Sequence, residues 1–310
     1  MSKIKKPNSF KRLVLYGFLT LFWLLYPGET QLLQKADLNL QAFAKKDNLD
    51  FVPQKLPKLL NPIDQQQIMA ESFLVMDLSS FTPVVTIKDK QKMYPASLVK
   101  LATAIVSYEH YSLEEILTVK KVINEELKMD LVKNERISAL NLLYGILVYS
   151  ANDAAYTLAE NYPGGVKSFV EQMNLLARRL KMDDTFFVNP IGFDAANQYT
   201  TAYDLAILSR EFVNNPVLLN IASTKSITVS DADFEHFHYL SSINELLGEI
   251  PHLGGLKTGT TDNAGQNLIS FYRFQKKPLI IVVLKSQDRF VDTRAIIDHL
   301  NNNLIYQEII

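Results

Sequence analysis

The chain alternates between strand-like and helix-like blocks of hydrophobic positions, and the order of these blocks predicts its architecture. Two short apolar runs, Ser72–Leu78 and Thr82–Ile87, are separated by a short turn and predict a β-hairpin. Between about residues 112 and 222, most segments repeat their apolar positions with a helical period. Strand-like runs return from residue 225 onward, and a last helix is predicted over roughly Phe290–Leu304.

This order of strands, many helices, strands and a last helix predicts the fold class. The early and late strands can share one antiparallel sheet only if the helical middle of the chain is an insertion between them. We therefore expect an α+β fold, in which an antiparallel sheet is flanked by helices and carries a mostly helical insertion. The functional site is expected in the cleft between the two. The predicted helices of the middle region are Ser97–Tyr108, Ala139–Val148, Asn152–Asn161, Val166–Leu180 and Ala202–Asn214, and the later strands are Lys225–Val229, Gly255–Thr258, Gln266–Phe274 and Pro278–Leu284.

The N-terminal segment has the layout of an export signal. Five basic residues and no acidic residue lie within residues 1–12, and Leu13–Tyr26 follows as 14 residues without a charge. The positive flank places the lysines before Leu13 in the cytoplasm and everything after Tyr26 outside it. We predict three parts: an export signal or membrane anchor over residues 1–28, a spacer over residues 29–69 and a catalytic domain over residues 70–310.

The sequence leaves open whether the apolar segment 13–26 is removed. A run of 14 residues is short for a full membrane span, yet no small-x-small cleavage site follows it directly. The Ala-x-Ala sequence at Ala42–Ala44 lies too far downstream. These observations slightly favour an uncleaved anchor in the cytoplasmic membrane over release after cleavage. Both outcomes place the protein outside the cytoplasm.

Composition and charge exclude several classes of function. The net charge of −1 and the scattered basic residues give no reason to expect a nucleic-acid partner. The absence of cysteine excludes a thiol nucleophile, disulfide bonds and a cysteine zinc site. None of the five histidines forms the H-E-x-x-H zinc motif. His236 and His238, two residues apart, are expected on a solvated strand face, so a zinc peptidase is disfavoured.

The first candidate motif is Ser97-Leu98-Val99-Lys100. At the start of a predicted helix, positions i and i+3 share a face, so the Lys100 amine can reach the Ser97 hydroxyl. A serine hydroxyl needs a base to become a nucleophile, and lysine is a base only when burial or nearby positive charge lowers its pKa. The motif alone is weak, because Ser2-Lys3-Ile4-Lys5 also fits S-x-x-K and a serine at a helix start is more often a cap.

Two further motifs follow along the chain. Ser150 and Asn152 form S-x-N, which offers a hydroxyl and an amide for proton transfer and substrate binding, although a helix-capping turn has the same sequence. K-T-G occurs once, at Lys257, Thr258 and Gly259. A strand lysine provides positive charge for a carboxylate, the threonine provides a hydroxyl donor, and the glycine allows close backbone approach. A glycine-rich hairpin edge is the alternative interpretation.

The three motifs in this order are far more specific than any one of them. S-x-x-K, S-D-N and K-T-G together are the signature of β-lactamases and penicillin-binding proteins, and here Ala151 takes the middle position of the second motif. The chain resembles the D-alanyl-D-alanine carboxypeptidases, the low-molecular-mass penicillin-binding proteins, over about residues 70–300. The stretches that carry the resemblance are YPASLVKLATA, LLYGILVYSANDAAYTLAE, FVEQMNLLARRLKMDDTFFVNPIGFD, YTTAYDLAILSREF, YLSSINELL and GGLKTGTTDNAGQNLIS.

The resemblance implies a β-lactamase/transpeptidase-like fold and a reaction without metal or organic cofactor. It implies that Ser97 attacks the carbonyl between two D-alanines at the end of a peptidoglycan stem peptide. Lys100 would be the general base and Ser150 a proton shuttle, and the backbone N–H groups of Ser97 and Thr260 would form the oxyanion hole. β-Lactam antibiotics would acylate Ser97. The residues implied in substrate binding are Asn152, Lys257, Thr258, Gly259 and Thr260.

The chain departs from many members of this family at its C-terminal end. Those members carry a β-rich domain after the catalytic domain, followed by an amphipathic membrane helix. This chain ends at Ile310, directly after the predicted closing helix. We therefore expect neither feature, and we expect any membrane attachment to use the N-terminal segment.

Three alternative functions share parts of this pattern. A D,D-endopeptidase would use the same residues on crosslinked peptidoglycan. A β-lactamase is less expected, because Glu171–Leu175 matches the E-x-x-L-N motif of class A enzymes only in the wrong order. A non-catalytic protein that binds cell-wall peptides ranks low, because the positions for nucleophile, base and carboxylate binding are all present.

Overall fold

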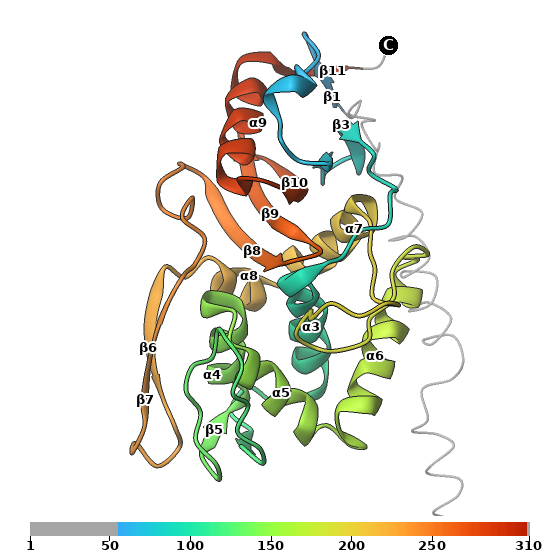
Figure 1. Cartoon of the computed structure of the whole chain (residues 1–310). Helices are drawn as coiled ribbons and strands as arrows, with labels where there is room; N and C mark the ends of the chain where they lie inside the picture. The colour runs from blue at the N-terminus through green and yellow to red at the C-terminus, as the bar shows by residue number, and fades with distance from the viewer. Residues whose placement is uncertain (1–54, 309–310) are drawn as a thin grey trace, which may run out of the picture. The chain divides into compact units, whose positions relative to one another are not determined.

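A five-stranded antiparallel sheet forms the centre of the folded body in the computed structural model, which describes residues 55–308 (Figure 1). The strands are β2 (Ser72–Asp77), β3 (Thr82–Ile87), β8 (Leu253–Thr261), β9 (Gly265–Phe274) and β10 (Lys277–Ser286). Their order is β3-β2-β10-β9-β8, so the two early strands lie beside the three late ones. The two groups meet where β2 pairs with β10, and Leu74 lies opposite Val282.

Helices make up most of the regular secondary structure between β3 and β8, which confirms the predicted insertion and the α+β class. The insertion packs against one face of the sheet, and α9 (Arg289–Asn303) packs against the other (Figure 1). The prediction of a single α-helix over Ala139–Val148 is wrong in its second half, because Gly145–Tyr149 forms a π-helical turn. The helices of the insertion are α3 (Lys100–His110), α4 (Ala139–Tyr144), α5 (Asn152–Asn161), α6 (Gly165–Arg179), α7 (Ala202–Val213) and α8 (Pro216–Ala222).

The two faces of the sheet have separate hydrophobic cores, because successive side chains of a strand point to opposite faces. On β10, Ile280 and Val282 belong to the core shared with the helical insertion. Ile281 and Val283 belong to the core beneath α9, and all four side chains are fully buried. Burial on both faces explains why this strand has a continuous apolar run instead of alternating polar and apolar positions.

The folded body begins earlier than the sequence predicts. β1 (Lys55–Leu59) pairs antiparallel with β11 (Leu304–Glu308), so the predicted start of the folded domain at residue 70 is wrong. β1 is short and contains Pro57, which is tolerated there because the strand lies in a two-stranded edge pair. Its partner comes from the far end of the chain, so the local sequence carries little sign of the pairing.

Two small antiparallel pairs accompany the helices of the insertion. β6 (Ser226–Ser230), which overlaps a predicted strand, pairs with β7 (Phe237–Ser241), which was not predicted. β4 (Ile116–Thr118) pairs with β5 (Arg136–Ser138) inside the insertion. Figure 1 shows the β6–β7 hairpin running alongside α4, away from the end of the sheet that carries β8.

The predicted export signal or anchor, residues 1–28, and the first part of the predicted spacer, residues 29–54, lie outside the described residues. Within residues 55–308, no helix has both the length and the apolar character that a membrane span requires. Anchoring through residues 13–26 therefore stays a prediction.

Candidate active site

Ser97 lies in a 3-10 turn, Ala96–Val99, that leads directly into α3. The turn brings the Lys100 Nζ to 2.9 Å from the Ser97 Oγ, which confirms the predicted contact between these side chains. The buried amide of Asn267 on β9 fixes the turn to the sheet by donating to two backbone carbonyls just before it. Ser97 is half-buried whereas Lys100 is fully buried, so a ligand can reach the hydroxyl but water has little access to the amine.

The Lys100 amine has three hydrogen-bond partners in this dry setting. Besides the contact with Ser97, its Nζ donates to the Asn152 Oδ1 at 2.7 Å and to the Ile191 carbonyl at 3.0 Å. Burial lowers the pKa of Lys100 to about 7, against a smaller opposing effect of the Asp153 carboxylate. A substantial fraction of this lysine is therefore neutral near pH 7, and a neutral Nζ can accept the Ser97 proton.

Ser150 and Asn152 reach the site from the junction between the π-helical turn and α5. Ser150 has a left-handed backbone (φ 68°) and is fully buried, and its Oγ has no hydrogen-bond partner in the described part of the chain. A buried hydroxyl without a partner is costly unless a ligand engages it. Asn152 is fixed from both ends, since its Oδ1 accepts from Lys100 and its Nδ2 donates to the Glu126 carbonyl at 2.6 Å.

β8 carries K-T-G at the edge of the sheet, beside the Ser97 turn. A Cβ atom on Gly259 would lie 2.9 Å from the Ser97 backbone nitrogen, so glycine allows this close approach. Lys257 is 2% exposed, and burial holds its pKa well below the ordinary value, helped by the positive charges of Lys100 and Arg289. The Thr258 Oγ1 is buried, and no partner for it lies within residues 55–308.

Arg289 is a site residue that the sequence did not indicate. It is the first residue of α9, and its Nη1 donates to the Gly259 carbonyl at 3.0 Å and to the Thr260 Oγ1 at 2.6 Å. No motif marks it, because the fold brings the start of α9 to the edge of β8. All three predicted motifs contribute to the same cavity of about 230 Å³, which is lined by Ser97, Leu127, Ser150, Ile243, Thr258, Gly259, Thr260 and Arg289.

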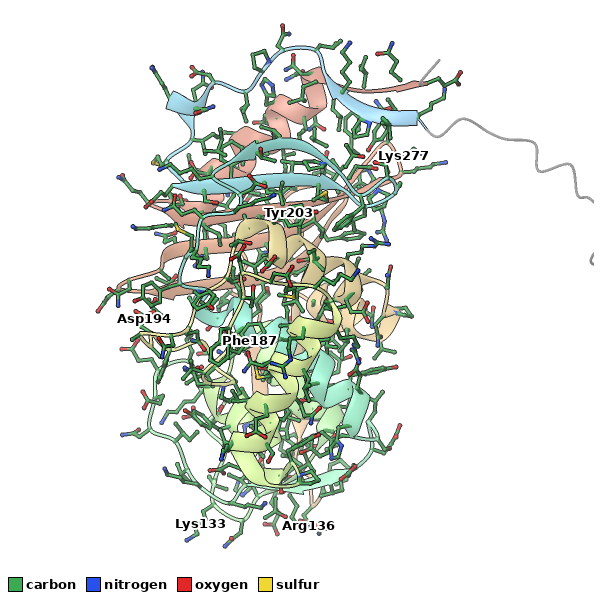
Figure 2. All side chains as sticks on the ribbon, turned by 90° about the vertical axis from the view of Figure 1, so that its right-hand side faces the viewer. Lys133, Arg136, Phe187, Asp194, Tyr203 and Lys277 are labelled. Atoms are coloured by element: carbon green, nitrogen blue, oxygen red, sulfur yellow. The ribbon has the colours of Figure 1, made fainter. Side chains whose placement is uncertain are left out.

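A loop of the insertion supplies the Ile191 carbonyl that accepts from Lys100. The Asn189 Oδ1 holds this loop in place by accepting from three successive backbone N–H groups. Farther along, the Asp194 carboxylate accepts from the Thr261 hydroxyl at 2.8 Å, at the end of β8. Figure 2 shows Asp194 at the boundary between the sheet and the insertion. The role of Ile191 was not predicted, because a backbone acceptor has no residue signature.

Comparison with known proteins agrees with this arrangement of residues. The profile of the D-alanyl-D-alanine carboxypeptidase family matches residues 60–288, which contain all three motifs. The chain belongs to this family. The start of the match at residue 60 also agrees with a folded body that begins before residue 70.

Members of the carboxypeptidase family that are similar to this chain differ in length and in the reaction after which they are named. The D-alanyl-D-alanine carboxypeptidase DacD of Escherichia coli is 32% identical over 260 residues, which are 79% of this chain and only 63% of that relative. A D-alanyl-D-alanine endopeptidase of Pseudomonas aeruginosa is 32% identical over 248 residues, which are 76% of each chain. The ampicillin-bound structure of penicillin-binding protein D2 of Listeria monocytogenes has a TM-score of 0.66 and 30% identity, and the match covers 75% of this chain and 97% of that one.

Gly192 has little room for a side chain in this family member, so we expect Gly192→Ala to be strongly destabilising. Its φ is +97°, and a Cβ atom there would lie 1.9 Å from the Ala96 carbonyl oxygen, next to Ser97. We expect a loss of about 3 kcal/mol or more in the free energy of unfolding, together with slower acylation by penicillin. Urea denaturation and the rate of labelling by a fluorescent penicillin would measure the two effects.

Gly165→Ala is the matched control for this substitution. Gly165 also has a positive φ, +71°, but its Cβ atom would meet nothing within 4 Å. We expect it to cost only the backbone strain of about 1–2 kcal/mol and to leave the labelling rate unchanged. Equal effects of the two substitutions would show that the contact at Ala96 is unimportant.

His238 is buried, which corrects the prediction of a solvated strand face. The strand alternation is present, but His238 points inward at 7% exposure, because β7 packs its inner face against the insertion. Its Nδ1 lies 2.6 Å from the Met129 carbonyl and its Nε2 lies 2.7 Å from the Glu135 carboxylate. Both partners are acceptors, which favours an imidazolium that donates from both nitrogens. This pair holds the loop that contributes Leu127 to the cavity.

The His238–Glu135 pair gives the protein a pH-dependent stability. Burial lowers the pKa of His238, but the hydrogen bond and charge of Glu135, the hydrogen bond with the Met129 carbonyl and the charge of Asp153 together raise it more, so the folded pKa lies above the ordinary value. The stabilisation is therefore complete below about pH 6.5 and is lost as the pH rises through the folded pKa. We expect His238→Gln to lower stability by about 2 kcal/mol at pH 5.5 and by less at pH 8.5.

Thermal unfolding of the parent and of His238→Gln across this pH range would measure the effect. His236→Gln is the matched control, because His236 lies just before β7 and outside the buried pair. A stability difference between the parent and His238→Gln that does not change with pH would contradict the assignment of a charged His238.

Proposed function

We propose that this chain is a serine-type D-Ala-D-Ala carboxypeptidase, which removes the terminal D-alanine from peptidoglycan stem peptides. The observation that carries the proposal is the contact between the Ser97 hydroxyl and the buried Lys100 amine, whose pKa is lowered to about 7. The contact opens onto a cavity that also contains Thr258 and Arg289. A nucleophile beside its base and a cationic group for a carboxylate are what this reaction requires.

Acylation starts with proton transfer from the Ser97 hydroxyl to the neutral Lys100 amine. The Ser97 Oγ attacks the carbonyl carbon of the scissile peptide bond, and the backbone N–H groups of Ser97 and Thr260 stabilise the resulting oxyanion. The Ser150 hydroxyl, which has no partner within residues 55–308, relays the proton from the Lys100 ammonium to the leaving amine, so that Ser150 keeps a proton and Lys100 becomes neutral again. The C–N bond breaks and D-alanine leaves. Water then attacks the acyl carbonyl and gives a proton to Lys100, the bond between the acyl carbon and the Ser97 Oγ breaks, and Lys100 returns the proton to Ser97.

The substrate carboxylate is bound at the edge of β8. The Thr258 hydroxyl is unpartnered among the described residues and lines the cavity, and the Arg289 guanidinium lies at the same wall. Lys257 lies behind them with a lowered pKa, and an arriving carboxylate would favour its charged form. Asn152 binds the peptide amide. These groups together select a substrate with a free C-terminal carboxylate.

A β-lactam antibiotic presents a carboxylate and a reactive carbonyl, so it acylates Ser97 through the same groups. The relative from Listeria monocytogenes in its ampicillin-bound form supports this proposal. We further propose that the protein acts outside the cytoplasm, where peptidoglycan lies. Residues 13–26 would either anchor it in the cytoplasmic membrane or be removed on export.

A comparison of two substrates tests the proposed function. The purified chain from residue 30 onward is incubated with a pentapeptide ending in D-Ala-D-Ala and, separately, with a D,D-crosslinked dimer. We expect release of free D-alanine from the pentapeptide at a higher kcat/KM than cleavage of the dimer. Preferential cleavage of the dimer would favour the endopeptidase alternative. The relative from Pseudomonas aeruginosa is named as such an endopeptidase. Reaction with neither substrate would refute the proposal.

A further inference from the structure

The β6–β7 hairpin carries aromatic side chains that the proposed reaction does not use. Along β7 the side chains alternate, so that His238 and Leu240 are buried while Phe237 and Tyr239 are 64% and 70% exposed. Phe234, in the turn between the two strands, is 72% exposed. Grouped exposed aromatic side chains mark a surface that meets another molecule, because their exposure to water is unfavourable.

Hydroxyl groups accompany these rings on the same outward face. Each outward residue of β7 lies opposite a serine or threonine of β6 in the antiparallel register, and residues directly opposite one another share a face. Flat rings beside hydroxyls suit a sugar, whose C–H faces stack on the rings while its hydroxyls exchange hydrogen bonds with the side chains. This aromatic face consists of Phe237, Tyr239, Ser241, Ser226, Thr228 and Ser230.

The aromatic face leads toward the catalytic cavity. Ile243, two residues beyond the end of β7, lines the cavity together with Ser97. An extended chain spans at most about 3.6 Å per residue, so the Cα atom of Tyr239 lies within about 14 Å of the Cα atom of Ile243. Figure 1 shows the hairpin extending from this end along the insertion. A polymer bound to the aromatic face would therefore hold its side branches close to the cavity.

The charges of the hairpin turn disfavour an anionic membrane as the occupant of this face. The exposed charged residues of the turn are Asp233 and Glu235, and Arg136, which approaches the turn, is paired with Asp233 at 3.1 Å. An anionic bilayer would repel these carboxylates, and it would desolvate the neighbouring hydroxyls of β6. The backbone of a neutral polysaccharide incurs neither cost.

We propose that the aromatic face binds the glycan strand of peptidoglycan and presents the attached stem peptide to the Ser97 cavity. The inference rests on the proposed function for the identity of the polymer, because the substrate peptide of that reaction is attached to this glycan. It adds a second binding surface, which gives polymeric substrate an advantage over free peptide. Phe237 and Tyr239 supply the stacking platform, at a spacing of one pleat along β7.

Binding of peptide-free glycan strands tests the proposal without involving the reaction. Soluble chitin oligosaccharides, which have the same kind of N-acetylated amino-sugar backbone but neither peptide nor charge, are titrated against the Ser97→Ala variant in a fluorescence assay. We expect the additional double substitution Phe237→Ser/Tyr239→Ser to weaken binding at least about ten-fold. Leu175→Ser is the matched control, because it removes an exposed apolar side chain from α6, and it should bind like the parent.

The remaining measurements separate the possible outcomes. In a chain that retains Ser97, the Phe237→Ser/Tyr239→Ser variant should take up fluorescent penicillin normally and cleave soluble pentapeptide at the parental rate. Both results would also show that the variant is folded. Tyr239→Ser alone replaces it if the double variant is unfolded. Equal glycan binding by parent and variant overturns the proposal. So does variant-sensitive binding to phosphatidylglycerol vesicles in place of glycan. If the chain binds glycan but cleaves no pentapeptide, the proposed function is refuted and the proposed binding role of the aromatic face still stands.

Discussion

The Ser97→Ala variant is expected to take up no fluorescent penicillin under conditions in which the parent chain is fully labelled. The substitution removes the Oγ atom that lies 2.9 Å from the Lys100 Nζ, and no covalent acyl-enzyme can form without that atom. Gel fluorescence and the mass of the intact protein measure the label. The same variant is expected to release no detectable D-alanine from the pentapeptide.

Ser242→Ala is the matched control, because Ser242 begins the second S-x-N sequence of the chain and its hydroxyl makes only a local contact to the Asn244 backbone. We expect this control to label like the parent. Labelling of Ser97→Ala at a comparable rate would show that a different side chain is acylated, and it would remove the basis of the proposed mechanism.

Acylation of the parent chain is expected to accelerate as the pH rises through about 7 and then to level off. Lys100 must be neutral to accept the Ser97 proton, and its pKa is lowered to about 7, so the fraction in the active form grows over this range. Lys100→Arg keeps a positive charge but cannot lose its proton at these pH values. We expect it to lower the acylation rate by about 10²–10⁴-fold and to abolish the rise with pH.

The rate of penicillin labelling between pH 5.5 and 9 measures this profile. Lys225→Arg, at an exposed lysine just before β6, is the control and should keep the parental profile. A Lys100→Arg variant with a nearly parental rate and the same inflection would contradict the role of Lys100 as base. An inflection that moves with substitutions at Lys257 and not at Lys100 would assign the titration to Lys257.

The sequence predicted those parts of the site that have side-chain motifs and a regular spacing. Ser97 and Lys100 meet because i and i+3 share a helical face, and this local geometry is the same in any helix start. Ser150 and the K-T-G motif were connected to them only through the order of the motifs. The structure brings Ser150, Thr258 and Gly259 to the cavity that Ser97 lines. Arg289 has no motif, and its place depends on how α9 meets β8, which is a property of the whole fold.

The fold was predictable to a similar extent and for similar reasons. The apolar runs of β9 and β10 are long enough to be recognised locally, and the helical insertion follows from the order of the blocks. β1 and β11 were not predicted, because each is a short edge strand that is stabilised by the other. His238 was misplaced because alternation along a strand shows which residues share a face but not which face is buried.

The pairing of β2 with β10 has a consequence for how the chain would fold during the proposed export. Leu74 must find Val282, so the central sheet cannot be completed until nearly the whole chain is available. Contacts between residues so far apart in sequence form slowly, because the intervening chain must first lose its freedom. A chain threaded through a membrane pore from its N-terminus would thus arrive without its central sheet. In the proposed export, late closure of the sheet would keep the chain unfolded for passage, and the complete site would form only after passage.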